Sequence, residues 1–301
     1  MKLLNFGSLN LDYVYRVERF VRPGETLSAA SQTVNAGGKG LNQSIALRRA
    51  GAAVYHAGCL GAGGESLGAL LRENGVDTTY LRPVEALQGN AVIQVAPSGE
   101  NCILLYGGSN QCVTAEQIDA TLEHFSAGDW LLLQNEVNLL PLLVDKARAR
   151  GLRIALNPSP CDEKIAAVDL GKLDWLLVNE VEAEQLTDER EPEAAWRRLH
   201  ERYPTLSLLL TLGAAGSMAW RVAAGSVETA WQEAFRVEAV DTTAAGDTYT
   251  GYFLAALLEG RPLAACMRRA GMASALSVTR PGAAPSIPVR DEVEEALTKA
   301  R

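Results

Sequence analysis

Short apolar segments alternate with amphipathic ones through the middle of this 301-residue sequence. Residues 130–134, 152–156, 174–178 and 206–210 are each strongly apolar and have the length of a buried strand rather than of a helix. Helical patterns lie between them, for example at residues 139–150. This alternation predicts an α/β fold, a three-layer sandwich in which helices cover both faces of a mainly parallel central sheet.

Two other segments lack a helical period and interrupt the α/β alternation. Residues 13–34 are short, alternating and broken by a Pro-Gly-Glu turn at 23–25, and residues 89–106 have the pattern of a hairpin around a turn at 97–101. We expect these inserts, at about 12–35 and 88–108, to join into a small β-sheet. Such a sheet could act as a lid over a cleft within a single domain, residues 1–301.

Composition and charge exclude several classes of function. The net charge of −8 opposes binding to nucleic acid or to anionic membranes, and no stretch is apolar over membrane-spanning length. The N-terminus shows no cleavable signal, and the five cysteines are scattered without a Cys-x-x-Cys pair. These features predict a cytoplasmic protein that binds neither nucleic acid nor membrane.

The most informative stretch is residues 241–251, between an expected strand at 235–240 and an expected helix. At a strand-to-helix corner the first helical amides and the helix dipole favour an anion such as phosphate. Three residues here are too small to cover those amides, namely Ala244, Ala245 and Gly246. Asp247 would repel a phosphate, so it is better explained as a base that takes a proton from an attacking hydroxyl. The alternative is a first-turn acid that only complements the dipole.

Two N-terminal segments could bind a polyhydroxylated ligand. Asn10 and Asp12 lie two residues apart, so in an extended chain their side chains point the same way and can accept from adjacent hydroxyls, although an Asx turn is an alternative. Residues 35–43 place glycines around Lys39 just before an expected helix at 44–50. This segment is not a Walker A loop, and it could cradle a sugar with its amides and Asn42 or simply form a tight turn.

Further candidates lie at the ends of later strands. Glu136 follows the strand at 130–134, at the edge where open parallel sheets bind ligands. Asn179 and Glu182 are one helical turn apart and offer oxygen ligands for Mg²⁺, or are ordinary surface residues. A bare glycine turn follows at 211–216. The loop at 279–286 could hold a monovalent cation with its carbonyls or be a plain surface loop.

In their order and spacing, these motifs resemble the ribokinase branch of the PfkB family of carbohydrate kinases. The resemblance spans almost the whole chain, at residues 7–12, 23–26, 37–42, 156–160, 179–182, 241–248 and 278–286. It implies a ribokinase-like fold, cytoplasmic carbohydrate metabolism, and a homodimer formed through the lid sheet. The implied reaction transfers the γ-phosphate of ATP to the 5-hydroxyl of D-ribose, with Mg²⁺ and K⁺ as cofactors. Another pentose, deoxyribose, a nucleoside or a hexose is the alternative acceptor, and a catalytically silent sugar sensor is a rival of another class.

The resemblance also implies a role for each candidate residue. Asp247 matches the base, beside an anion hole of Ala244, Ala245 and Gly246. The sugar contacts match Asn10, Asp12, Gly38, Lys39, Gly40, Asn42, Glu136 and Asp247. The nucleotide side matches Asn179, Thr211, Gly213, Gly216 and Gly246. Glu182 matches an acid that holds Mg²⁺ through water, and a K⁺ site matches Asp241, Thr243, Ser277, Arg280, Gly282 and Ser286. The chain departs from the family at residues 269–272, Arg-Ala-Gly-Met, where many members have a His or Asn beside the adenine.

Overall fold

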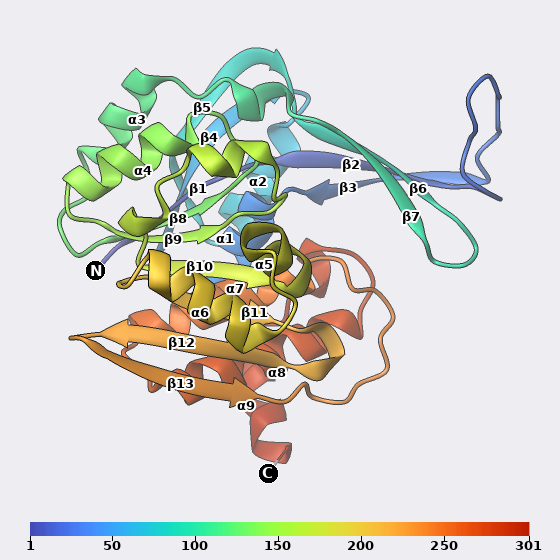
Figure 1. Ribbon diagram of the computed structural model, residues 1–301. Coiled ribbons are helices and arrows are strands. Elements are labelled where there is room, and N and C mark those ends of the chain that lie inside the picture. The colour runs from blue at the N-terminus through green and yellow to red at the C-terminus, as the bar shows by residue number, and fades with distance from the viewer. Residues whose placement is uncertain (301) are drawn as a thin grey trace.

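The protein is built around one large sheet, which the computed structural model describes together with the rest of residues 1–300 (Figure 1). Its strands are β1 (Leu3–Phe6), β4 (Val54–Ala62), β5 (Asp77–Leu87), β8 (Trp130–Gln134), β9 (Arg153–Asn157), β10 (Trp175–Asn179), β11 (Ser207–Thr211), β12 (Ser217–Ala223) and β13 (Ser226–Gln232). They lie in the order β13-β12-β11-β10-β9-β8-β1-β4-β5. All neighbours are parallel except β11 with β12 and β12 with β13, which are antiparallel.

Helices cover both faces of this sheet. One face carries α1 (Lys39–Arg49), α2 (Glu65–Glu73), α7 (Ala245–Leu258), α8 (Leu263–Val278) and α9 (Arg290–Lys299), and the other carries α3 (Ala115–Leu122), α4 (Leu140–Ala149), α5 (Glu180–Thr187) and α6 (Pro192–Arg202). Successive residues of one strand enter different cores: Leu132 packs with the first set, Leu131 and Leu133 with the second. Short 3₁₀ turns occupy Gly108–Gln111, Glu163–Ala167, Leu170–Lys172, Gly213–Ala215 and Ala284–Ser286. The predicted three-layer α/β fold is confirmed.

A second, four-stranded sheet projects from the core, and we call it the lid sheet (Figure 1). It contains β2 (Asn10–Arg16), β3 (Ser31–Gly37), β6 (Asn90–Val95) and β7 (Asn101–Tyr106) in the order β3-β2-β6-β7. The β2 and β3 strands are antiparallel, β2 and β6 are parallel, and β6 and β7 form the predicted hairpin. The two segments that interrupt the α/β pattern therefore meet in one sheet.

Two local predictions are wrong. The strand expected at residues 235–240 is not formed, because residues 236–240 are exposed and no strand pairs with them. The chain has already made the β12–β13 hairpin before this segment. The helix expected at 44–50 begins earlier, at Lys39, so the glycine-rich segment supplies its first turn. Gly40 permits this early start because it packs against the backbone of the turn that follows β1. Any side chain would clash there, since a Cβ on Gly40 would lie 2.3 Å from the Ser8 amide nitrogen.

Candidate active site

The N-terminus of α7 presents uncovered backbone donors, as its sequence predicts. Ala244 caps the helix in the left-handed region, at φ 60°. The Ala245 amide donates to the Thr242 carbonyl at 3.2 Å, whereas the amides of Gly246 and Asp247 have no hydrogen-bond acceptor within residues 1–300. A Cβ on Gly246 would meet nothing within 4 Å. Free amides, the helix dipole and open space make this helix end suitable for a phosphoryl group.

The Asp247 side chain is buried and held by two consecutive residues of α1. The side-chain amide of Gln43 donates to Asp247 Oδ1 at 2.8 Å, and that of Asn42 donates to Oδ2 at 3.0 Å. The two helices approach closely where Gly251 faces Ala46, since a Cβ on Gly251 would lie 2.4 Å from the Ala46 Cβ. This contact lies one turn beyond Asp247 and sets the separation at which both amides reach the carboxylate.

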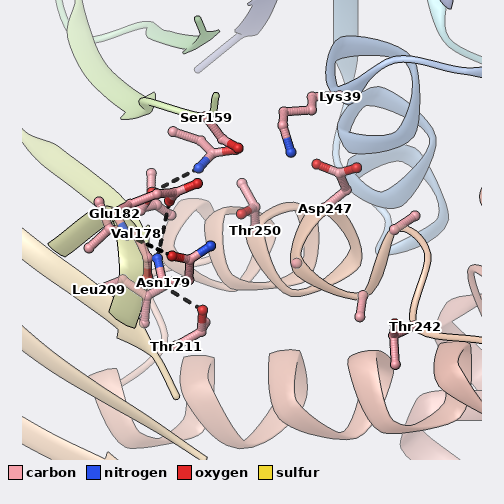
Figure 2. A pocket seen from close by; sticks show the side chains of 15 residues that line it. Lys39, Ser159, Val178, Asn179, Glu182, Leu209, Thr211, Thr242, Asp247 and Thr250 are labelled. Atoms are coloured by element: carbon pink, nitrogen blue, oxygen red, sulfur yellow. Dashed lines mark hydrogen bonds between the residues drawn. The ribbon is translucent and has the colours of Figure 1, made fainter. Parts of the chain in front are cut away.

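Lys39 points toward the Asp247 carboxylate across the cavity in Figure 2. Burial by itself would lower the pKa of Lys39, but the negative charges of Asp247, Glu136 and Glu182 outweigh it and raise that pKa. The ammonium group therefore stays charged at neutral pH. A cation held at this position can neutralise a phosphate that would otherwise be repelled by Asp247.

Carboxylates converge on the side of the site that the sequence assigns to the sugar. Asp12 lies on β2, and burial together with the charges of Glu136 and Asp247 raises its pKa from 3.8 to about 7. Burial also raises the pKa of Glu136, whose carboxylate accepts from the Lys39 amide at 2.9 Å and from the Ser8 hydroxyl. These carboxylates are costly to bury together, which is typical of a site whose ligand supplies hydroxyl donors.

Two asparagines complete this side of the site. Asn10 is buried, and its Oδ1 accepts from the side-chain amide of Asn110 at 2.7 Å. Asn42 uses its amide hydrogen for Asp247, while its Oδ1 is buried without a hydrogen-bond partner among the described residues. A buried acceptor without a donor fits a site that a ligand hydroxyl completes.

Two adjoining cavities extend away from Asp247. The smaller, of about 250 Å³, is lined by Lys39, Asp247, Asn179 and Glu182 among others (Figure 2). The larger, of about 760 Å³, is lined mainly by the glycine turn that contains Gly213 and Gly216, by residues 231–237, and by α7 and α8. Both cavities share four lining residues, which are Thr211, Thr242, Ala245 and Gly246. The N-terminus of α7 thus stands between a large, partly apolar cavity and the buried Asp247 carboxylate.

Asn179 and Glu182 form a capping box at the start of α5. The Glu182 amide donates to Asn179 Oδ1 at 2.8 Å, and the Asn179 amide donates to Glu182 Oε2 at 3.1 Å. They are therefore not a pair of free ligands on one helix face, because one oxygen of each already accepts from the backbone. Glu182 Oε1 is not used in this cap, and a buried carboxylate on the cavity wall fits a water-shelled Mg²⁺.

The predicted cation loop brings its residues together beside α7. The Asp241 carboxylate accepts from the Gly282 amide at 2.8 Å and from the amide of Thr243 at 2.9 Å. The Arg280 amide donates to the Ser277 carbonyl at 3.1 Å, while the Arg280 side chain pairs with Glu292. The Ser286 hydroxyl donates to the Ala283 carbonyl. Asp241 and the backbone carbonyls of this loop are hard oxygen donors, the type that suits an alkali cation.

The sequence did not reveal several buried amides that support the site. Gln43, Asn110, Gln134 and Asn157 each hydrogen-bond to a predicted site residue or to one another. The available signals were the position of Gln43, next to Asn42 in the glycine-rich segment, and that of Asn157, within the motif at 156–160. Arg269, at the departure from the family motif, does not line the larger cavity; it pairs with Glu259, and Gly271 lines that cavity instead.

A model of one protein family, described as "pfkB family carbohydrate kinase", matches residues 1–290. The chain belongs to this family. A ribokinase of Haemophilus influenzae is 36% identical over 98% of this chain and 97% of its own length. A deoxyribokinase of Salmonella typhi is 30% identical over 99% of both chains. The structure of Arabidopsis thaliana ribokinase complexed with ribose and ATP superposes with a TM-score of 0.82, at 28% identity over 98% of both chains.

As a pfkB-family member, the chain is a phosphotransferase that acts on an alcohol group. The resemblance of its motifs is thereby confirmed at the level of family, fold and class of reaction. Within residues 1–300, no helix is long and apolar enough to cross a membrane.

Proposed function

We propose that this protein is an ATP-dependent sugar kinase that phosphorylates the 5-hydroxyl of D-ribose. The observation that carries this function is the buried Asp247 carboxylate beside the uncovered first amides of α7 and close to Asp12, Asn42 and Glu136. The similarity to ribokinases along the full chain supports ribose as the acceptor. ATP would extend from the larger cavity, past the end of α7, into the smaller one.

The geometry divides the chemistry among few groups. Asp247 takes the proton of the sugar hydroxyl as the oxygen attacks the γ-phosphorus of ATP. The amides of Gly246 and Asp247 and the ammonium of Lys39 stabilise the charge that develops on the transferred phosphoryl group. Glu182 would hold Mg²⁺ through water, and bound Mg²⁺ would neutralise the nucleotide phosphates. K⁺ beside Asp241 would add positive charge next to the α7 N-terminus.

Deoxyribose is the alternative acceptor, since the deoxyribokinase of Salmonella typhi is also similar over the full chain. The paired Asn10 and Asp12 favour a sugar with adjacent hydroxyls. Asn10 Oδ1 already accepts from Asn110, so a deoxy analogue would mainly leave the Asp12 carboxylate without a donor, at a cost of about 1–3 kcal/mol. We therefore expect a higher kcat/KM for ribose than for deoxyribose, measured across a panel of pentoses, hexoses and nucleosides in potassium and in sodium buffer.

The base is tested by Asp247→Asn. We expect kcat with ribose to fall roughly 10²–10⁴-fold, because the variant keeps the shape of the side chain but cannot accept the proton. Ribose binding, measured by calorimetry, should persist. Turnover at the wild-type rate would remove Asp247 from the mechanism, and loss of ribose binding would instead indicate a structural role.

We also propose that the protein is cytoplasmic and a homodimer joined through the lid sheet. The apolar residues along the edge strand β7 support the dimer. Four consecutive large apolar side chains are exposed there, namely Ile103, Leu104, Leu105 and Tyr106, and a run of this kind is normally buried against a partner.

A further inference from the structure

A chain of buried amide side chains lies behind Asp247 and contacts no part of either cavity except through Asn157. Gln43 donates through Nε2 to Asp247 Oδ1 at 2.8 Å and to Asn157 Oδ1 at 3.1 Å. Its Oε1 accepts from Gln134 at 2.7 Å, and Gln134 also donates to Asn5 at 2.9 Å. Asn5, Gln43 and Gln134 are fully buried. Gln134 Oε1 has no hydrogen-bond partner among the described residues, so burying these amides together is an expensive arrangement unless its geometry is used.

Both ends of this chain are fixed by backbone carbonyls, which can only accept. The Asn157 amide donates to the Leu177 carbonyl at 2.9 Å, so Asn157 must present its oxygen to Gln43. At the other end Asn5 donates to the Gly40 carbonyl at 2.8 Å, so Asn5 presents its oxygen to Gln134. Gln134 must then present its nitrogen to the oxygen of Gln43. The nitrogen of Gln43 is therefore left for Asp247, and the amide cannot rotate without breaking bonds at both ends.

The sheet provides the spacing for this chain. Gln134 and Asn157 are register partners on β8 and β9, and Asn5 lies on β1, the neighbour of β8. Gln43 reaches them from α1, which also carries Asn42. The carboxylate on α7 is thus tied to three strands of the central sheet through one glutamine.

We propose that Gln43 is a positioning residue for phosphoryl transfer: its amide, oriented by this chain, holds the Asp247 carboxylate as a hydrogen-bond acceptor beside the anion hole. This inference rests on the proposed function. Without Gln43, Asp247 keeps one amide donor, from Asn42, and its carboxylate can turn about that contact. Misplacement of a catalytic group by about 1 Å can reduce a rate about 10²-fold while leaving substrate contacts intact.

The first test is Gln43→Met, which keeps the length of the side chain and removes both its donor and its acceptor. We expect the single-turnover rate of phosphoryl transfer to ribose to fall about 10- to 100-fold, with KM for ATP and the ribose dissociation constant within about threefold of wild type. Gln117→Met is the matched control. Gln117 is also buried and donates to the Gly58 carbonyl, but it lies on α3 and has no contact with Asp247.

The second test is Gln134→Met, which does not touch Asp247 and should act only through Gln43. We expect a smaller loss of the transfer rate, and no further loss when this change is combined with Gln43→Met, because both act through the same chain. If these residues had a purely structural role, each variant would lose thermal stability, but the losses of transfer rate in the two single variants would not overlap in the double variant. If Gln43→Met fails to fold, the transfer rate of Gln134→Met alone tests the proposal, and a wild-type rate in that variant would overturn it.

The proposal is overturned if Gln43→Met transfers phosphate at the wild-type rate, if its loss matches that of Gln117→Met, or if KM rises in proportion to the loss in rate. Failure of the proposed function gives a different result, because the wild-type protein itself would then phosphorylate neither ribose nor another sugar of the panel.

Discussion

Asp12, which we propose contacts the sugar, carries a carboxyl group whose protonation state should decide how well a sugar binds. Its pKa of about 7 in the ligand-free site arises from burial and from the neighbouring charges of Glu136 and Asp247. Because this pKa is raised, the folded protein binds a proton at Asp12 more tightly than the unfolded chain does. The stability contributed by the group is therefore present below the unfolded pKa of 3.8 and is lost as the pH rises toward 7.

Sugar binding should show the opposite dependence on pH. Hydroxyl donors favour the ionised carboxylate, so ribose affinity should be highest above pH 7 and should weaken by up to about tenfold per pH unit below it. Calorimetry at pH 8 and pH 6, in buffers of different ionisation enthalpy, would measure both the affinity and the release of the proton. Asp12→Asn should bind ribose more weakly and almost independently of pH. Equal wild-type affinities at the two pH values would contradict the assignment of Asp12 to the sugar.

At the scale of elements, α7 carries the proposed base, Asp247, and the proposed anion hole in one helical turn. Local sequence was sufficient to predict this turn, because small residues before an acid leave the amides uncovered whatever lies around them. It could not predict the partner of the acid. Gln43 and Asp247 are 204 residues apart in the sequence, and they meet only because α1 and α7 pack together at Gly251. The prediction of a strand at 235–240 was wrong for a related reason, because an alternating sequence does not show whether a neighbouring strand is available to pair with it.

The open space at Gly246 gives a prediction for this helix. Gly246→Ala should fold normally, and its stability should be unchanged or higher by about 0.5–1 kcal/mol, because the added methyl group meets no atom within 4 Å. The methyl group would stand where a phosphoryl group approaches the amides. We expect kcat/KM for ATP to fall about 10²-fold or more. Steady-state kinetics and thermal denaturation measure the two effects. A fully active variant would show that the phosphate lies elsewhere, and a destabilised one would contradict the open space at Gly246.

For the whole molecule, the parallel, helix-covered main sheet follows from the α/β alternation, whereas its order of strands and the pairing of the lid strands required the structure. Parallel pairing of β2 with β6 joins segments that only the folded chain brings together. The exposed apolar residues of β7 are the basis for the proposed dimer.

The dimer is tested by Leu104→Lys, at a side chain that is 71% exposed. Light scattering after gel filtration should give about twice the 32.2 kDa chain mass for the wild type and about one chain mass for the variant. Val289→Lys is a matched control, because Val289 is 47% exposed but lies outside the lid sheet. A wild-type monomer, or a variant that remains dimeric, would contradict association through β7.

The placement of Asp12 on β2 separates two kinds of selectivity between two parts of the chain. The residues assigned to ATP all belong to the central sheet, its turns and its helices, whereas Asp12, a proposed hydroxyl acceptor, belongs to the lid sheet. Acceptor preference and donor preference can therefore diverge separately during evolution. A chimaera that received the lid sheet of a deoxyribose-specific relative should therefore change its sugar specificity and keep its nucleotide specificity.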